Sequence, residues 1–310
     1  MKVLLATSKP FSPKAVQGIT NIIESAGHEL VKLEKYTEQS ELIEAVKDVS
    51  AIIIRSDIID KEVIEAAPEL KIVVRAGSGY DNVDLDTATK HGVCVMNTPG
   101  QNANAVAELV VGMMLYMNRN QFDGSAGKEA INRRIGLYAY GSVAKNVARI
   151  AEGLNMTIYA YSRTLAKDTE NKVGEFGVHT AYSNEELFDN SDVISLHTPL
   201  NENTRKCVNY NLLSRMAQDG LLINTARKEV VNEDDLIRIM EERPAFKYAT
   251  DIQADKHELF LEKFPKRYFA TPKKMGAQTG EANVNAGMAS AHQIVSFFKD
   301  GDETFRVNKK

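Results

Sequence analysis

The sequence predicts an α/β protein made of two doubly wound parallel sheets. Short runs rich in valine, isoleucine and leucine alternate with amphipathic segments along the chain, which is the pattern of strand–helix repeats. The run at residues 51–54 is apolar throughout, as expected for a parallel strand that helices cover on both faces. The alternation breaks at residues 97–100, where proline and glycine follow a strand, and then resumes. We therefore expect two α/β domains joined near residue 98.

The first domain is predicted from the alternation before this break. We expect its strands at residues 3–6, 29–33, 51–54, 71–74 and 93–96, and its helices at residues 14–26, 41–47, 61–66 and 84–91. A last helix at residues 281–299 closes the chain. We expect this helix to return to the first domain, because chain crossings pair up when one domain is inserted into another.

The second domain is predicted between the two crossings. It begins with a long helix at residues 104–119 and a polar loop at 121–134. We expect its strands at residues 135–138, 157–161, 193–197, 221–225, 248–252 and 267–270, and further helices at 142–154 and 233–241. The predicted domains are thus residues 1–97 with 281–310, and residues 98–280.

Composition excludes several classes of protein. A chain of 310 residues with 43% hydrophobic and 26% charged residues has an ordinary globular composition, and the net charge of −4 gives no reason to expect nucleic acid. No apolar run is long enough to span a membrane, and the amino-terminal run predicts a first strand, not a signal peptide. Cys94 and Cys207 lie far apart, so we expect no disulfide and a cytoplasmic location. The histidines have no metal-like spacing, so no metal is expected.

A candidate phosphate-binding turn lies at residues 139–144. An apolar strand leads into Ala-Tyr-Gly-Ser-Val-Ala, and a helical pattern follows. In the dinucleotide fingerprint Gly-x-Gly-x-x-Gly, the middle glycine lets the backbone approach the pyrophosphate, and the third position needs only a small residue. Gly141 and Ala144 meet these demands, whereas Ala139 departs from the pattern. A plain strand-to-helix turn is the alternative. The expected pyrophosphate contacts are Tyr140, Gly141, Ser142 and Val143.

Ser162 and Arg163 bear on the choice between NAD and NADP. An acidic residue usually ends the second strand of a dinucleotide domain and binds the ribose 2′-hydroxyl. Ser162 occupies that position here, and Arg163 follows it. A hydroxyl and a guanidinium suit a 2′-phosphate, so NADP stays open beside NAD, as does a solvated Arg163 without a role.

Two strand ends of the first domain carry candidate anion-binding residues. Arg75 precedes a loop that contains Gly77, Ser78 and Gly79, whose backbone N–H groups can bind a carboxylate or phosphate. Arg55, followed by a serine, ends an earlier strand. Ligands bind beyond the carboxyl ends of parallel strands, so the two arginines can converge on one anion. A tight turn with solvated arginines is the alternative.

Several segments resemble the D-isomer-specific 2-hydroxyacid dehydrogenases. The matching segments, in the family's order, are 75–84, 97–99 with 106–108, 195–200, 223–227 and 276–279. They spread over nearly the whole chain and favour the branch that oxidises 3-phospho-D-glycerate. The resemblance implies a flavodoxin-like substrate domain with an inserted Rossmann dinucleotide-binding domain and NAD as cofactor. It also implies a short form without the regulatory domain that some members carry.

The resemblance also implies roles for individual residues. Arg227 matches the family's catalytic arginine, and Asp251 matches the residue near the nicotinamide amide. The further cofactor contacts it implies are His197, Thr198, Thr225, Ala226, Gly276 and Ala277. The substrate contacts are Arg55, Ser56, Arg75, Gly77, Ser78, Gly79 and Asn102.

The family's catalytic histidine and glutamate have no match in this chain. Aligned leftwards from Gly276, Lys274 takes the place of the histidine, and aligned from the preceding proline, Lys273 does. We favour Lys274, because the turn into the following helix fixes the geometry better. A lysine-bearing subgroup of the family is similar in this respect. An ammonium can protonate the alkoxide that forms when a 2-keto acid is reduced, and Asp255 is expected to orient it. Two solvated lysines without a catalytic role are the alternative.

The expected function is hydride transfer between NAD(P) and the pair 3-phospho-D-glycerate and 3-phosphohydroxypyruvate, the first step of L-serine biosynthesis. The resemblance implies a homodimer formed through the dinucleotide domain. Two rivals stay open. One is a hydroxypyruvate or glyoxylate reductase of the same family. The other is an NAD(H)-sensing protein without turnover, which the lost histidine and glutamate suggest.

Overall fold

The structure is a computed structural model that describes residues 1–167 and 175–309. The chain divides into two compact units, which are described separately. Unit 1 comprises Met1–Asn102 and Ala277–Lys310, and unit 2 comprises Ala103–Gly276. Both contain parallel sheets covered by helices, so the predicted α/β class is confirmed. In the part of the chain that is described, no helix has the length and hydropathy needed to cross a membrane.

Unit 1 is built on a five-stranded parallel sheet with the order β2-β1-β3-β4-β5. This is the flavodoxin-like order that the sequence implied. The strands are β1 (Lys2–Thr7), β2 (Glu29–Glu34), β3 (Ala51–Ile54), β4 (Ile72–Arg75) and β5 (Cys94–Asn97). The helices are α1 (Pro13–Ser25), α2 (Gln39–Ala45), α3 (Lys61–Glu65), α4 (Leu85–Lys90) and α11 (Gly280–Asp300).

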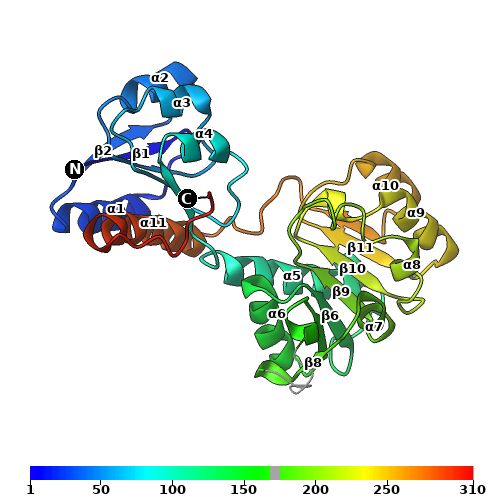
Figure 1. Ribbon diagram of the computed structural model, residues 1–310. Coiled ribbons are helices and arrows are strands. Elements are labelled where there is room, and N and C mark those ends of the chain that lie inside the picture. The colour runs from blue at the N-terminus through cyan, green and yellow to red at the C-terminus, as the bar shows by residue number, and fades with distance from the viewer. Residues whose placement is uncertain (168–174, 310) are drawn as a thin grey trace. The chain divides into compact units, whose positions relative to one another are not determined.

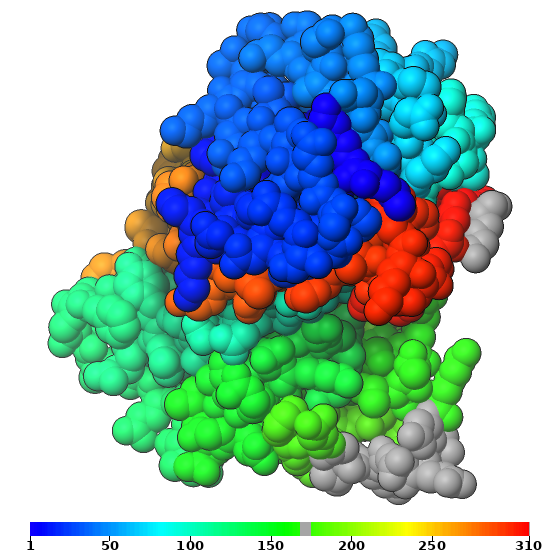
Figure 2. Space-filling view, turned by 90° about the vertical axis from the view of Figure 1, so that its left-hand side faces the viewer, coloured from blue at the N-terminus to red at the C-terminus, as the bar shows by residue number. Residues whose placement is uncertain are grey.

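Alternate residues of each strand face opposite helix layers of unit 1. Val3 and Ile53 pack with α1 and α11, whereas Leu4 and Ile52 pack with α2, α3 and α4 (Figure 1). Helix α11 therefore returns to unit 1 and lies against α1, the dark blue surface beside the red one in Figure 2. Gly287 permits this close crossing, since a Cβ there would lie 3.0 Å from Cδ1 of Ile19.

Unit 2 is built on a seven-stranded parallel sheet with the order β12-β11-β10-β9-β6-β7-β8. The strands are β6 (Arg134–Tyr138), β7 (Thr157–Tyr161), β8 (Val178–Thr180), β9 (Val193–Leu196), β10 (Leu221–Asn224), β11 (Lys247–Thr250) and β12 (Tyr268–Ala270). The helices are α5 (Ala103–Asn118), α6 (Ser142–Gly153), α7 (Asn184–Asp189), α8 (Tyr210–Leu213), α9 (Glu233–Glu242) and α10 (His257–Lys263). Helices α5 and α6 share one core with the sheet, and α7 to α10 share the other. This is a Rossmann arrangement.

Four short elements of unit 2 were not predicted, namely β8, α7, α8 and α10. Each has between three and seven residues, too few for a clear hydrophobic period. Their positions depend on tertiary packing instead. Phe260 of α10, for example, stacks on Tyr268 with a centroid distance of 4.9 Å.

The strand orders define where ligands bind. In unit 2 successive strands are added on one side of β6 and then, from β9 onward, on its other side. In unit 1 the same change of side occurs between β1 and β3. Ligands of open parallel sheets bind at these points, beyond the carboxyl ends of the strands. The turn after β6 and the loops after β3 and β4 stand at these edges.

Candidate functional site

The turn after β6 has the geometry of a phosphate-binding loop with one strained residue. Gly141 is the N-cap of α6 and no side chain caps this helix end, so its first N–H groups are available to an anion. No atom would lie within 4 Å of a Cβ at Gly141, so the backbone is open there. Ala139 adopts φ = 72°, a left-handed conformation that favours glycine. The first position of the fingerprint therefore favours glycine because of its backbone conformation. Ala139 adopts that conformation in spite of its side chain.

The loops after β9 and β10 lie beside this turn, because both strands follow β6 in the sheet. His197 follows β9, and burial lowers the pKa of its ring to about 3, so the imidazole is neutral at pH 7. Its Nε2 is buried without a hydrogen-bond partner in the described residues, as is Oγ1 of Thr225. Thr198 and Ala226 are buried at the same edge. The carboxyl edge of the sheet in unit 2 therefore carries neutral polar atoms that could hydrogen-bond to a ligand.

Ser162 and Arg163 follow β7 as predicted, but the serine is already engaged. Its Oγ accepts a hydrogen bond of 3.1 Å from the N–H of Leu165 and caps a short 3₁₀ turn. The hydroxyl proton of Ser162 stays available for donation. Arg163 is exposed. The pair is thus placed beyond the carboxyl end of the strand next to β6.

Arg227 and Lys274 converge on one backbone carbonyl in unit 2. The guanidinium of Arg227 donates to the carbonyl oxygen of Ala226 at 2.9 Å, and Nζ of Lys274 donates to the same oxygen at 3.1 Å. The loop is held by the buried Asn224, whose Oδ1 accepts from the N–H of Ala226 and whose Nδ2 donates to the carbonyl of Arg227. Two cations thus meet beyond the end of β10.

The carboxylate of Asp251 interacts electrostatically with both Lys274 and Arg227. It is 1% exposed, and its Oδ2 accepts the N–H of Gly276 at 3.0 Å. Burial raises its pKa, while Lys274, the Gly276 N–H and Arg227 act in the opposite direction. Glycine is required at 276, because a Cβ would lie 2.8 Å from Oδ2 of Asp251. Ala277, the next residue, already belongs to unit 1.

Asp255 and Lys273 do not join this cluster. Asp255 is exposed and forms an ion pair with Lys228, so it does not hold the ammonium of Lys274 as its spacing suggested. The backbone N–H of Asp255 donates to Glu233 at the start of α9, which fixes this loop to α9. Lys273 and Lys274 are both exposed, but only Lys274 has a hydrogen bond from its ammonium to the carbonyl of Ala226 among the described residues, whereas the carbonyl of Lys273 accepts from Oγ1 of Thr271. The structure therefore places Lys274, and not Lys273, beside Arg227.

In unit 1 the guanidinium of Arg55 is held by neutral oxygens. It donates to the carbonyls of Lys9 at 3.3 Å and Pro10 at 3.4 Å, and to Oδ1 of Asn283 at 2.5 Å. Its carbon lies 5.1 Å from the ring centre of Phe11. Burial lowers the pKa of Arg55, and the nearby Asp57 counteracts this only in part. A half-buried cation with neutral acceptors is a group that an incoming anion would stabilise.

Asp57 is committed to other partners, because its Oδ1 accepts from the N–H of Ser8 and the hydroxyl of Tyr36. The carboxylate thus organises the loop after β1 and does not ion-pair with Arg55. Ser56 lies between the two residues and is exposed.

Arg75 covers the glycine loop that follows it. A Cβ at Gly77 would lie 1.7 Å from Nη1 of Arg75, and Gly77 adopts φ = 151°. The loop therefore needs glycine in order to admit the arginine. Nε of Arg75 donates to the carbonyl of Arg55 at 2.9 Å, which joins the two strand ends. Ser78 donates to Oδ1 of Asn102 at 3.2 Å, and Gly79 follows in the same loop.

Three residues of these clusters were not predicted from the sequence: Lys9, Asn224 and Asn283. Lys9 and Asn283 hold Arg55 from the loop after β1 and from the first turn of α11. Asn224 is the last residue of a buried strand, and a polar residue in that position is a signal that could have been used. Nothing in the local pattern marks Lys9 or Asn283, because their roles depend on contacts distant in sequence.

A doubly wound unit with a glycine turn at its switch point, joined to a second sheet unit with arginines at its strand ends, is typical of an α/β protein of the dehydrogenase class. The chain belongs to the D-isomer specific 2-hydroxyacid dehydrogenase family, whose catalytic-domain model matches residues 5–308. The family resemblance inferred from the motifs is thereby confirmed. Members of this family are oxidoreductases.

The chain is similar to family members that are named for different substrates. It is 30% identical to a glyoxylate reductase of Thermococcus litoralis, over 91% of the chain and 90% of that protein. It is 32% identical to a D-3-phosphoglycerate dehydrogenase of Haemophilus influenzae, over 94% of the chain and 75% of that protein. A crystal structure of NAD+-bound 3-phosphoglycerate dehydrogenase from Entamoeba histolytica is 45% identical, with a TM-score of 0.88 over 100% of the chain and 99% of that chain.

Proposed function

We propose that the protein is a D-3-phosphoglycerate dehydrogenase that uses NAD. The observation that carries the substrate assignment is the half-buried guanidinium of Arg55, whose hydrogen bonds in the described residues go to neutral oxygens. A small keto acid offers one carboxylate, whereas 3-phosphohydroxypyruvate also offers a phosphate that can neutralise such a cation. The similarity to the Entamoeba histolytica enzyme supports the same assignment.

The cofactor would lie along the carboxyl edge of the sheet in unit 2. Backbone N–H groups at Gly141, Ser142 and Val143 would bind the pyrophosphate, with Tyr140 beside them. We propose NAD over NADP, since the Entamoeba histolytica enzyme has NAD+ bound in its crystal structure. Ser162 and Arg163 keep NADP as the second possibility. The remaining proposed cofactor contacts are His197, Thr198, Thr225, Ala226, Asp251, Gly276 and Ala277.

The substrate would be bound by its two anionic groups. The loop with Gly77, Ser78 and Gly79 would bind the carboxylate through backbone N–H groups, and Asn102 would orient Ser78. Arg55 and Arg75 would bind the phosphate, with Ser56 at the edge of that site. Because Lys9 and Asn283 fix the guanidinium of Arg55, its position is set before substrate arrives.

Arg227 and Lys274 would perform the proton chemistry. When bound, NAD would accept the hydride that leaves C2 of 3-phospho-D-glycerate. Arg227 would polarise the C2 oxygen, and Lys274 as the neutral amine would take the hydroxyl proton while the carbonyl forms. In reduction the ammonium of Lys274 returns that proton. Asp251 would position the segment that carries Lys274 through its hydrogen bond with the N–H of Gly276. Asp255, which was expected to orient the ammonium, pairs with Lys228 instead.

A hydroxypyruvate or glyoxylate reductase is the second candidate, because relatives at about 30% identity carry those names. The test is kcat/KM for 3-phosphohydroxypyruvate, hydroxypyruvate and glyoxylate with NADH and with NADPH. We expect kcat/KM to be at least about 100-fold higher for the phosphorylated acid, because one charge-assisted hydrogen bond contributes a free energy of that size. Equal or better use of glyoxylate would replace the proposal with the second candidate. Binding of NADH without turnover of any keto acid would make the protein a sensor.

On the proposed function the enzyme catalyses the first step of L-serine biosynthesis. We propose a homodimer formed through unit 2 and a cytoplasmic location. The two free thiols, Cys94 and Cys207, agree with a reducing compartment. Sedimentation equilibrium tests the dimer, and a monomer at micromolar concentration would exclude it.

A further inference from the structure

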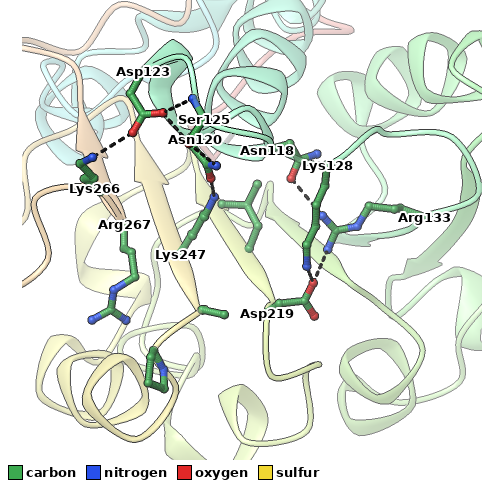
Figure 3. A pocket seen from close by; sticks show the side chains of 13 residues that line it. Asn118, Asn120, Asp123, Ser125, Lys128, Arg133, Asp219, Lys247, Lys266 and Arg267 are labelled. Carbon is green, nitrogen blue, oxygen red and sulfur yellow. Dashed lines mark hydrogen bonds and ion pairs between the residues drawn. The ribbon is translucent and has the colours of Figure 1, made fainter.

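Figure 3 shows a cavity of unit 2 that many charged and amide side chains line. Its volume is about 410 Å³, which is within the range of sites for small molecules. It is lined at the amino ends of the strands, where Leu221 starts β10, Lys247 starts β11 and Arg267 precedes β12. The turn at Gly141 follows the carboxyl end of β6. The strands between the edges are about 13 Å long, so the cavity is distinct from the proposed cofactor site.

The cavity concentrates positive charge in an acidic protein. Five cationic side chains line it, against two carboxylates, although the whole chain has a net charge of −4. The cationic residues are Lys128, Arg133, Lys247, Lys266 and Arg267, and the acidic ones are Asp123 and Asp219. An excess of three positive charges around one concave space focuses the field and attracts anions.

The two carboxylates are already occupied. Asp219 pairs with Lys128 and lies 3.7 Å from the guanidinium of Arg133. Asp123 pairs with Lys266 at 2.9 Å, and its other oxygen accepts from Ser125. The ion pairs of both carboxylates are thus with cations other than Lys247 and Arg267.

Those two cations have neutral acceptors. Nζ of Lys247 donates to the carbonyl of Met117 at 2.6 Å and to Oδ1 of Asn120 at 2.8 Å. Arg267 donates to carbonyls at the end of α9, among them that of Met240 at 2.7 Å. The partial charges of these helix ends offset each cation only in part. Burial lowers the pKa of Lys247, and Lys128 and Arg133 lower it further, while Asp123 and Asp219 act in the opposite direction.

Two further features favour a ligand in this cavity. Asn118 lines it, is 3% exposed, and has a buried Nδ2 without a hydrogen-bond partner in the described residues. Residues 120–122 all adopt positive φ without a glycine among them, a conformation that is strained for residues with a side chain. This strained turn points Asn120 at Lys247 and is fastened by Gln121, which donates to the carbonyl of Tyr268. Strain of this kind concentrates at functional sites.

We propose that this cavity is a second ligand site that binds a compact polyanion, with the chemistry shared by a tricarboxylate and a pyrophosphate. Such an anion brings about three negative charges into the space and supplies charged acceptors for Lys247 and Arg267 and a partner for Asn118. The proposal does not depend on the proposed dehydrogenase activity, because it involves no residue of the carboxyl edge.

Isothermal titration calorimetry on the full chain tests the proposal, with citrate and with pyrophosphate as probes. The variant Lys128→Gln with Lys266→Gln removes two charges from the cavity, and both side chains are more than half exposed, so folding is preserved. The control Lys256→Gln with Lys263→Gln removes two charges of the same unit outside the cavity, each likewise paired to one carboxylate. Thermal melts of both variants verify folding.

We expect one site per chain and a Kd that rises at least about tenfold in the cavity variant but less than twofold in the control. The better of the two probes identifies the ligand class. Equal Kd values in both variants would overturn the proposal. So would binding that saturating NADH abolishes, because the anion would then occupy the cofactor site. The proposal would also be overturned if neither probe bound to the protein because the partner subunit of a dimer covers the cavity.

Discussion

Replacing Ala139 with glycine tests whether the phosphate turn is strained. At φ = 72° an L-residue costs about 1–2 kcal/mol relative to a right-handed conformation, and glycine adopts this φ freely. Glycine also gains freedom in the unfolded chain, which costs about 0.4–1 kcal/mol. The difference predicts that Ala139→Gly stabilises unit 2 by about 0.5–1 kcal/mol. For a domain of this size, that raises Tm by about 1–4 °C.

Differential scanning calorimetry at pH 7 measures this change. The matched control is Ala289→Gly inside α11, where the same methyl group is removed from helical backbone and the expected effect is a loss of about 1 kcal/mol. A drop in Tm for Ala139→Gly as large as that of the control would refute the strain argument. The Kd for NADH should also fall, because glycine removes a Cβ from the loop that the pyrophosphate would approach. An unchanged Kd would mean that Gly141 alone sets the turn.

Three further predictions follow from the clusters. Lys274→Ala should lower kcat at least about 100-fold, whereas Lys273→Ala should change it less than threefold, and steady-state kinetics with both variants decides between them. Arg55→Met should lower kcat/KM at least about tenfold for 3-phosphohydroxypyruvate but leave glyoxylate reduction nearly unchanged; an equal loss for both acids would remove Arg55 from phosphate binding. Asp251→Asn should stabilise the protein at pH 7. Burial raises the pKa of this carboxyl above its unfolded value, so the penalty for ionising it is present at neutral pH and vanishes below the unfolded pKa. Urea melts of the wild type and the variant at pH 7 and pH 3.5 measure the change in the free energy of unfolding. An equal change at both pH values would contradict the prediction.

The long elements could be predicted from the sequence because each carries its own period. The run at residues 51–54 is apolar without interruption and forms β3, and the long apolar helix α5 begins and ends within one residue of its prediction. Short elements such as α10 could not, because Phe260 and its aromatic partners are brought together only by the fold. The strand-end arginines were found by position, since each follows an apolar run.

Contacts between side chains were harder to predict than their positions. Asp255 has the spacing of a partner for Lys274, yet it pairs with Lys228, which the 3₁₀ turn after Arg227 brings closer. Asn283 lies more than two hundred residues from Arg55 in sequence and still fixes its guanidinium. Spacing along a chain places residues on elements, but a loop conformation decides which of them meet.

On the proposed assignment, the joint loss of the family's histidine and glutamate is chemically consistent. A carboxylate beside an imidazole helps it to hold a proton that it would otherwise release near neutral pH. Beside an ammonium, which already holds its proton strongly, the same carboxylate would oppose release to the substrate. The cluster instead sets Arg227 next to Lys274 on one carbonyl, and the carboxylate of Asp251 is buried and bonded to the N–H of Gly276. Replacing Asp255 with glutamate should therefore not raise activity while Lys274 is present.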